Sequence, residues 1–213
     1  MNRVPSCCVR TLEEAGKYGR YCLSHMGAFT LTQAARALGV AQHKLIHLCE
    51  KKVVVPDVRD ARGRGSSRKF SKRNLFDFAV ALEMRRLELP VSFVHAVLRV
   101  LGTFELEAKK MLGGFALPES LLVAGGPRLA VIIIDGERVY FSVATAGHHN
   151  RTFGGIAIRH PATRGRGQNR KAGRRLQQSE MATALATARG RVELDLSRIA
   201  RDLEEQLEAR SSS

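Results

Sequence analysis

The residues best suited to binding a ligand lie between Gln42 and Arg73, where amide and basic side chains recur. Gln42, His43, Lys44 and His47 are closely spaced, and such groups hydrogen-bond to base edges and phosphates. From Asp57 to Arg73 the chain carries seven cations and two acids, with glycines between them. Cations clustered in this way neutralise nucleic-acid phosphates. The spacing therefore predicts a polyanion-binding surface made of two neighbouring parts.

Two helices joined by a tight turn would position the first part. Gly39 supplies the positive φ of the turn, and Ala35 is small enough for the helices to pack closely. Leu38, Val40, Leu45 and Leu48 would fill the shared core. The outward face of the second helix, which includes Ala41 and Ile46, would then enter the major groove of DNA. The predicted DNA contacts are Gln33, Arg36, Gln42, His43, Lys44, His47, Lys51, Arg62, Arg64, Arg68, Lys69, Lys72 and Arg73.

The rest of the chain predicts an α+β protein. Ser71 would cap a helix that ends near Leu89-Pro90, and another helix would begin at Ser92. We expect a poorly ordered extension over 1–27, a DNA-binding domain over 28–112, and a C-terminal dimerisation or sensor domain over 113–213. In the last of these we expect a β-hairpin within 128–143 that turns at Asp135-Gly136, a basic loop over 164–175, and an amphipathic helix over 195–209 capped by Asp195 or Ser197.

The order of these parts resembles the mercury-resistance-regulator (MerR) superfamily of winged-helix transcription regulators. The resemblance covers about 28–101 and rests on FTLTQAARALGV, Pro56 after KKVVV, SSRKFS, and NLFDFAVALEMRRLELPVSFVHAVL. It implies a winged helix-turn-helix in which Arg68 and Phe70 match the family's Arg-x-Tyr, with Arg68 on a phosphate. Ile46 replaces the family's usual arginine, which indicates a different operator.

The resemblance also implies binding to double-stranded DNA as a homodimer, with RNA polymerase as a further partner. Members usually dimerise through a long helix after the DNA-binding domain, and no such helix is predicted after Leu101. The helix over 195–209 and the hairpin are our substitute candidates for the dimer contact.

Composition narrows the class of protein further. The 213 residues carry a formal net charge of +15, which favours a polyanionic partner. No apolar run reaches the roughly 18 residues of a membrane span, and no secretory signal is visible, so we expect a cytoplasmic, nucleoid-associated protein. Translation from Met1 and from Met26 are both compatible with the sequence.

We expect no enzyme activity, because no nucleophile elbow, phosphate-binding glycine loop or paired catalytic carboxylates are present. We expect no metal and no cofactor either. The cysteines, Cys7, Cys8, Cys22 and Cys49, lack zinc-site spacing, and none lies after the winged helix, where metal-sensing relatives carry theirs. His43, His47 and Glu50 have a spacing that could hold zinc, but no fourth ligand is evident.

Two other readings stay open at this point. One is an excisionase-like or nucleoid-associated architectural protein, because such proteins use similar winged helices. The other is an RNA-binding or protein-interaction module in which the Arg-rich loop over 164–175 is the active element.

Overall fold

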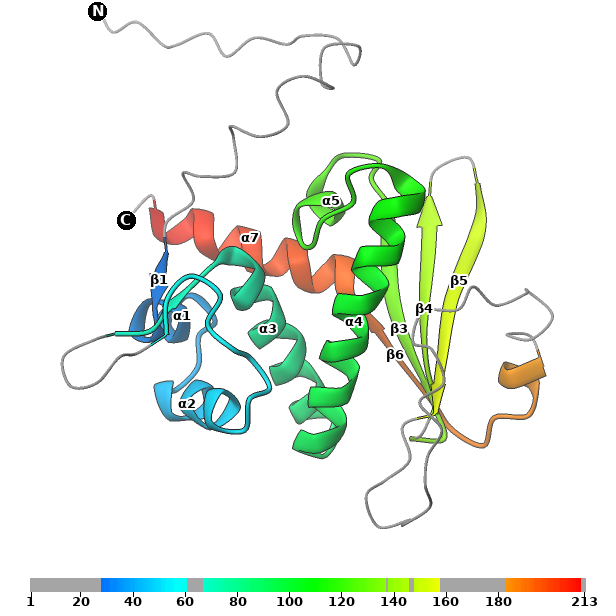
Figure 1. Cartoon of the computed structure of the whole chain (residues 1–213), viewed down its shortest axis with the longest axis horizontal. Helices are drawn as coiled ribbons and strands as arrows, with labels where there is room; N and C mark the ends of the chain where they lie inside the picture. The colour runs from blue at the N-terminus through cyan, green and yellow to red at the C-terminus, as the bar shows by residue number, and fades with distance from the viewer. Residues whose placement is uncertain (1–27, 61–66, 137, 146–147, 158–182, 212–213) are drawn as a thin grey trace, which may run out of the picture.

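The computed structural model describes residues 28–60, 67–136, 138–145, 148–157 and 183–211. The fold is mixed α+β, as predicted, with helices beside two antiparallel sheets, one of two strands and one of four. The predicted N-terminal extension, the loop residues Arg62 and Arg64, and the basic loop over 164–175 lie outside the described residues. Figure 1 shows the labelled helices gathered on one side of the four-stranded sheet, with α4 (Val91–Leu112) between α3 (Lys72–Arg86) and the sheet.

The first two helices, α1 (Leu31–Ala37) and α2 (Gln42–Glu50), meet through the predicted turn. Gly39 has a φ of +63°, a conformation that glycine adopts without the steric cost of a Cβ. Ala35, Leu45 and Leu48 are buried, as predicted for the packed sides of the two helices.

A reciprocal pair of hydrogen bonds fixes the start of α1. The Gln33 amide donates to Thr30 Oγ1 at 3.2 Å, and the Thr30 amide donates to Gln33 Oε1 at 2.8 Å. This capping box satisfies two backbone donors that would otherwise lack a partner. The entry to α1 is therefore locally encoded.

A small antiparallel sheet joins the start of α1 to the segment before α3. Strand β1 (Phe29–Thr30) pairs with β2 (Lys69–Phe70), and Arg59 forms an isolated bridge with Lys69. Phe70 is fully buried and meets Phe78 of α3 edge to face at 5.3 Å. Arg59 and Phe70, on either side of the predicted wing, are thus held next to the helical core.

Helix α3 begins as predicted, because Ser71 Oγ accepts a hydrogen bond from the Asn74 amide at 3.2 Å. It ends at Arg86, and α4 starts at Val91 directly after Pro90. The helix predicted to begin at Ser92 runs past Leu101. Helix α4 continues to Leu112, because Leu101, Phe104 and Ala108 keep an apolar face turned to the core.

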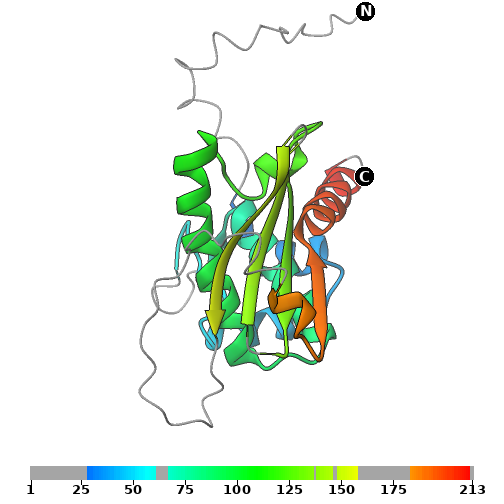
Figure 2. The ribbon, with the colours of Figure 1, turned by 90° about the vertical axis from the view of Figure 1, so that its right-hand side faces the viewer.

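The four-stranded sheet has the order β5-β4-β3-β6 and is antiparallel throughout (Figure 2). The predicted hairpin is present as β3 (Arg128–Ile134) and β4 (Arg138–Thr145), with positive φ at both Asp135 and Gly136. The sequence analysis did not predict the edge strands β5 (His148–Ala157) and β6 (Arg191–Asp195).

The C-terminal helix α7 (Leu196–Ser211) is amphipathic, as predicted, and Asp195 caps it by accepting from the Arg198 amide at 2.9 Å. The other cap candidate, Ser197, is buried, and its Oγ accepts from the Leu129 amide of β3 at 2.8 Å. Helix α7 packs on α1, α3, the short helix α5 (Glu119–Leu122) and β3.

One cluster of buried side chains runs through both predicted domains, from Ala34 to Leu203. Phe104 of α4 stacks on Phe141 of β4 with ring centroids 5.0 Å apart, which ties the helical part to the sheet. The apolar face of α7 is covered by this same core, with Leu196, Ala200 and Leu203 buried. That face is therefore not available for the dimer contact that the sequence analysis suggested.

Candidate nucleic-acid interface

The outward face of α2 carries the densest set of predicted contacts. Its inner side chains, Leu45, Leu48 and Cys49, are buried, whereas Ile46 is half-buried. Because a helix turns once every 3.6 residues, the remaining positions project to the other side. The predicted contacts that are exposed on or just beyond α2 are Gln42, His43, Lys44, His47 and Lys51.

Helix α1 adds two exposed side chains next to this face. Arg36 lies in the last turn of α1, and Gln33 lies in the first turn. The side-chain oxygen Oε1 of Gln33 already accepts the cap hydrogen bond from the Thr30 amide. Thr32 Oγ1 lies 3.4 Å from Gln42 Oε1, which links the first turns of the two helices. Within the described residues, the Gln33 side-chain amide donors and the Arg36 guanidinium have no hydrogen-bond or ion-pair partner.

The start of α2 has no side-chain cap, because its N-cap residue is Ala41. The first backbone amides of a helix lack acceptors within the helix and carry the positive end of its dipole. An anion at this end is favoured for that reason. The polar face of α2 therefore begins at a point that itself attracts phosphate.

The cations at the end of the predicted wing, just before α3, differ in their availability. Arg68 is 36% exposed and pairs with the more exposed Asp60, with Nε 3.2 Å from Oδ1. Lys69 is half-buried in β2, between Thr30 and Arg59. Arg68 can exchange an exposed carboxylate for a phosphate at little cost, because exposed ion pairs contribute at most about 1 kcal/mol.

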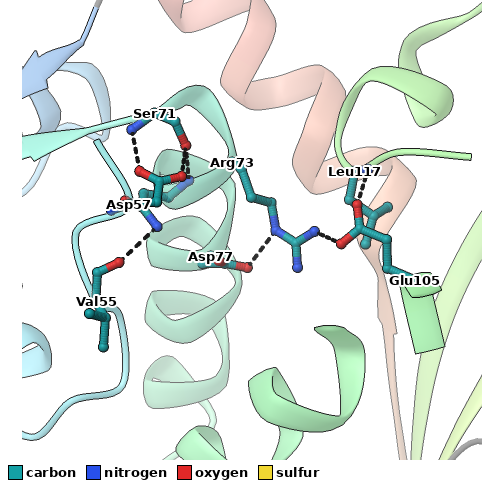
Figure 3. Close-up of polar contacts among 8 residues, drawn as sticks. Val55, Asp57, Ser71, Arg73, Asp77, Glu105 and Leu117 are labelled. Carbon is teal, nitrogen blue, oxygen red and sulfur yellow. Dashed lines mark hydrogen bonds and ion pairs between the residues drawn. The ribbon is translucent and has the colours of Figure 1, made fainter. Parts of the chain in front are cut away.

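Two predicted contacts, Lys72 and Arg73, are turned away from this surface and need correction. The Lys72 side chain is 8% exposed, and its ammonium pairs with Glu204 of α7. Arg73 is 22% exposed, and its guanidinium lies between Asp77 and Glu105 (Figure 3). Both cations already have carboxylate partners in a poorly hydrated setting, so neither is offered to a phosphate.

The Arg73 cluster also joins α3, α4 and the segment that precedes α5. Arg73 Nε donates to Asp77 Oδ1 at 3.1 Å, and its Nη1 donates to Glu105 of α4. The other oxygen of Glu105 accepts from the Leu117 amide at 2.7 Å, ahead of α5. Burial raises the pKa of Asp77 to about 6, against the opposing effect of Arg73. Burial acts to lower the pKa of Arg73, but the two carboxylates together raise it above its ordinary value.

A second polar cluster holds the segment between α2 and the loop against α3 (Figure 3). The carboxylate of Asp57 accepts from both the amide and the hydroxyl of Ser71. Asn74, which is buried, accepts from the Asp57 amide at 3.0 Å and donates to the Val55 carbonyl at 3.2 Å. These bonds fix the base of the loop relative to α2, which allows both parts of the surface to engage one ligand.

A groove that the sequence analysis missed runs between α2 and the end of α3. Its volume is about 460 Å³. Arg85 and Arg86 of α3 line it opposite Lys44 and His47 of α2. The sequence shows two adjacent arginines near the end of a predicted helix. Only the packing of α3 beside α2 shows that these arginines extend the basic surface of α2. The surface thus comprises α1, α2, the loop base and the end of α3.

Among the residues that the structure describes, no three His, Cys, Asp or Glu side chains are grouped so as to hold a metal ion. Cys49 is buried, and burial raises the pKa of its thiol, which disfavours the reactive thiolate. Within the same residues, no helix is both long and apolar enough to cross a membrane.

A search against protein-family models finds no match, and a search of curated proteins finds none either. Function is therefore inferred from the geometry of this surface.

Proposed function

We propose that this chain is a sequence-specific DNA-binding protein that regulates transcription in the nucleoid, through a winged helix-turn-helix of the MerR type. In this proposal α1 and α2 are the helix-turn-helix, and α2 enters the major groove. The segment from Asp57 to Phe70 is the wing, which contacts phosphates. The proposal includes a homodimer that binds an inverted repeat, and contact with RNA polymerase.

One observation carries the proposal: Gln42, His43, Lys44 and His47 are exposed on the outward face of α2, while the opposite face of the helix is buried in the core. A helix that serves only packing does not need Gln, His and Lys at successive outward turns beside further cations on neighbouring elements. Amide and basic groups on one projecting helix face suit base edges, and flanking arginines suit phosphates.

The placement of the cations supports DNA over a smaller polyanion. Arg36 comes from α1, Arg68 from the segment before β2, and Arg85 from the end of α3. A duplex presents phosphates on both sides of its major groove, so cations are required on both sides of a reading helix. Specificity would come from Gln42, His43, Lys44 and His47, and orientation from the surrounding cations.

The direct test is selection of bound duplexes from a random DNA pool by the full chain. We expect enrichment of one short sequence arranged as an inverted repeat. Lys44→Glu should abolish the enrichment, whereas Lys109→Glu, which changes an exposed charge near the end of α4, should leave it intact.

Other outcomes of the same selection would overturn the proposal. Uniform binding accompanied by DNA bending would indicate an architectural protein. Binding that tolerates Lys44→Glu and is lost on deletion of 164–175 would indicate the RNA-binding or protein-interaction module.

A further inference from the structure

The groove between α2 and the end of α3 combines an apolar floor with a cationic rim. Its floor is formed by Val40, Leu48 and Leu82, of which Leu48 is buried and the other two are half-buried. Lys44 and Arg85 stand on opposite rims. A DNA phosphate requires cations but no aliphatic surface. The floor is therefore a feature that the proposed function leaves unexplained.

The positive charge of the rim is largely uncompensated. Among the described residues that line the groove, none is Asp or Glu. The Arg85 guanidinium donates to the Leu89 carbonyl, a neutral partner that orients it without cancelling its charge. Over the described ranges, neither Lys44 nor Arg85 has a carboxylate within ion-pair distance, whereas Arg86 is paired with Glu83 at 2.6 Å. Lys44 and Arg85 are thus the cations open to an anionic ligand.

The size of the groove fits a small organic molecule. Its volume of about 460 Å³ falls within the roughly 300–1,000 Å³ of sites that take such ligands. Sites of this kind combine apolar walls with a few polar groups that fix orientation. The groove offers aliphatic contact along its floor and two charges at its rim, which a ligand with one apolar body and one anionic group would satisfy together.

We propose that this groove binds a small amphipathic organic anion, with its carboxylate or sulfonate between Lys44 and Arg85 and its apolar body on Val40 and Leu82. Lys44 belongs to the face of α2 that we assign to DNA, so ligand and DNA exclude each other. This exclusion rests on the proposed function, whereas binding of the anion does not. The groove is then an effector site that releases DNA by direct competition.

The test uses two probes that share a ring system and differ in charge, 2-naphthalenesulfonate and the neutral naphthalene-2-sulfonamide. Each is titrated into the full chain and followed by calorimetry, with circular dichroism to confirm that the fold is unchanged. The sulfonate should saturate one site and bind at least about tenfold more tightly than the sulfonamide, the scale of one charged hydrogen bond. Equal binding of the two probes, or no binding, would overturn the proposal.

Variants locate the site. Arg85→Ala should weaken sulfonate binding about tenfold, and Val40→Thr should weaken it to a smaller degree by placing a hydroxyl on the floor. Lys109→Ala removes an exposed cation that is not among the residues lining the groove, so it should leave sulfonate binding unchanged. Equal effects of Arg85→Ala and Lys109→Ala would mean non-specific attraction and would overturn the assignment.

Competition between the sulfonate and a DNA duplex tests the exclusion separately from ligand binding. A duplex that the chain binds should displace the sulfonate. If the sulfonate binds through Arg85 and the duplex does not displace it, the exclusion is wrong. If the chain binds no duplex at all while sulfonate binding still depends on Arg85, the site stands and the proposed function fails.

Discussion

Two regions of this molecule, the outward face of α2 and the start of α3, both carry basic residues in the sequence. In the fold, Lys44 of the first region is exposed, whereas the cations of the second are paired with acids. Lys44 is exposed with no carboxylate within ion-pair distance in the described part of the chain. Lys72 and Arg73 are paired with acids, Glu204 from α7 and Glu105 from α4. Charge in the sequence therefore identifies candidates, and partners from distant parts of the chain decide which cations reach a ligand.

The largest expected effect that separates the two regions concerns Arg73. Arg73→Ala leaves Asp77 and Glu105 as neighbouring carboxylates without their shared cation. Removing one partner from a buried ionic cluster costs about 3–5 kcal/mol. Urea unfolding should show a loss of that order in the free energy of unfolding. A loss below about 1 kcal/mol, together with weaker DNA binding, would mean that Arg73 serves the ligand after all.

The next effect is the pH dependence of stability that arises from Asp77. Its pKa is about 6 in the folded chain and 3.8 in the unfolded chain, so the folded state favours the protonated carboxyl. This contribution to stability is present at low pH and is lost as pH rises from about 4 through 6. Between pH 5 and pH 7 the loss is about 1 kcal/mol.

Comparison with Asp77→Asn isolates that contribution, because other titrating groups are common to both proteins. Relative to the variant, the wild type should lose about 1 kcal/mol of unfolding free energy between pH 5 and pH 7, as measured by urea unfolding at each pH. An identical pH dependence in the two proteins would show that Asp77 is ionised throughout this range.

The smallest expected change in stability lies on α2. Lys44→Ala removes an exposed side chain, so the free energy of unfolding should change by no more than about 0.5 kcal/mol. Its effect should appear in DNA affinity, which should fall about tenfold if one phosphate or base contact is lost. A stability loss comparable to that of Arg73→Ala would remove the distinction between the two regions.

Local signals in the sequence were sufficient for much of the helical part. Gly39, Ala35 and Ser71 act through neighbours within a few residues, and each has the predicted role. The hairpin at Asp135-Gly136 is similarly local. The outward face of α2 could be predicted because the helical period alone separates Leu45 and Leu48 from the exposed positions.

Long-range packing accounts for what the sequence did not reveal. Strand β6 is five residues long, which is too short to show a clear alternation of apolar and polar residues. Its pairing with β3 depends on contacts between distant parts of the chain. The apolar stripe of α7 predicted a helix but not its partner, which is the chain's own core. The burial of Lys72 follows from that same docking, because Glu204 lies on α7. The groove beside α2 depends on how α3 packs and has no signature of its own in the sequence.

The salt dependence of DNA binding tests the central claim most directly. The full chain, Arg68→Ala and the double variant Lys72→Met/Glu204→Leu, which replaces a buried ion pair by apolar side chains, are compared by fluorescence anisotropy with one bound duplex. We predict that Arg68→Ala, which removes a phosphate contact, reduces the slope of log affinity against log salt by about one, and that the double variant leaves the slope unchanged. An unchanged slope for Arg68→Ala with a reduced slope for the double variant would contradict the assignment of the interface to α2 and the loop beside it.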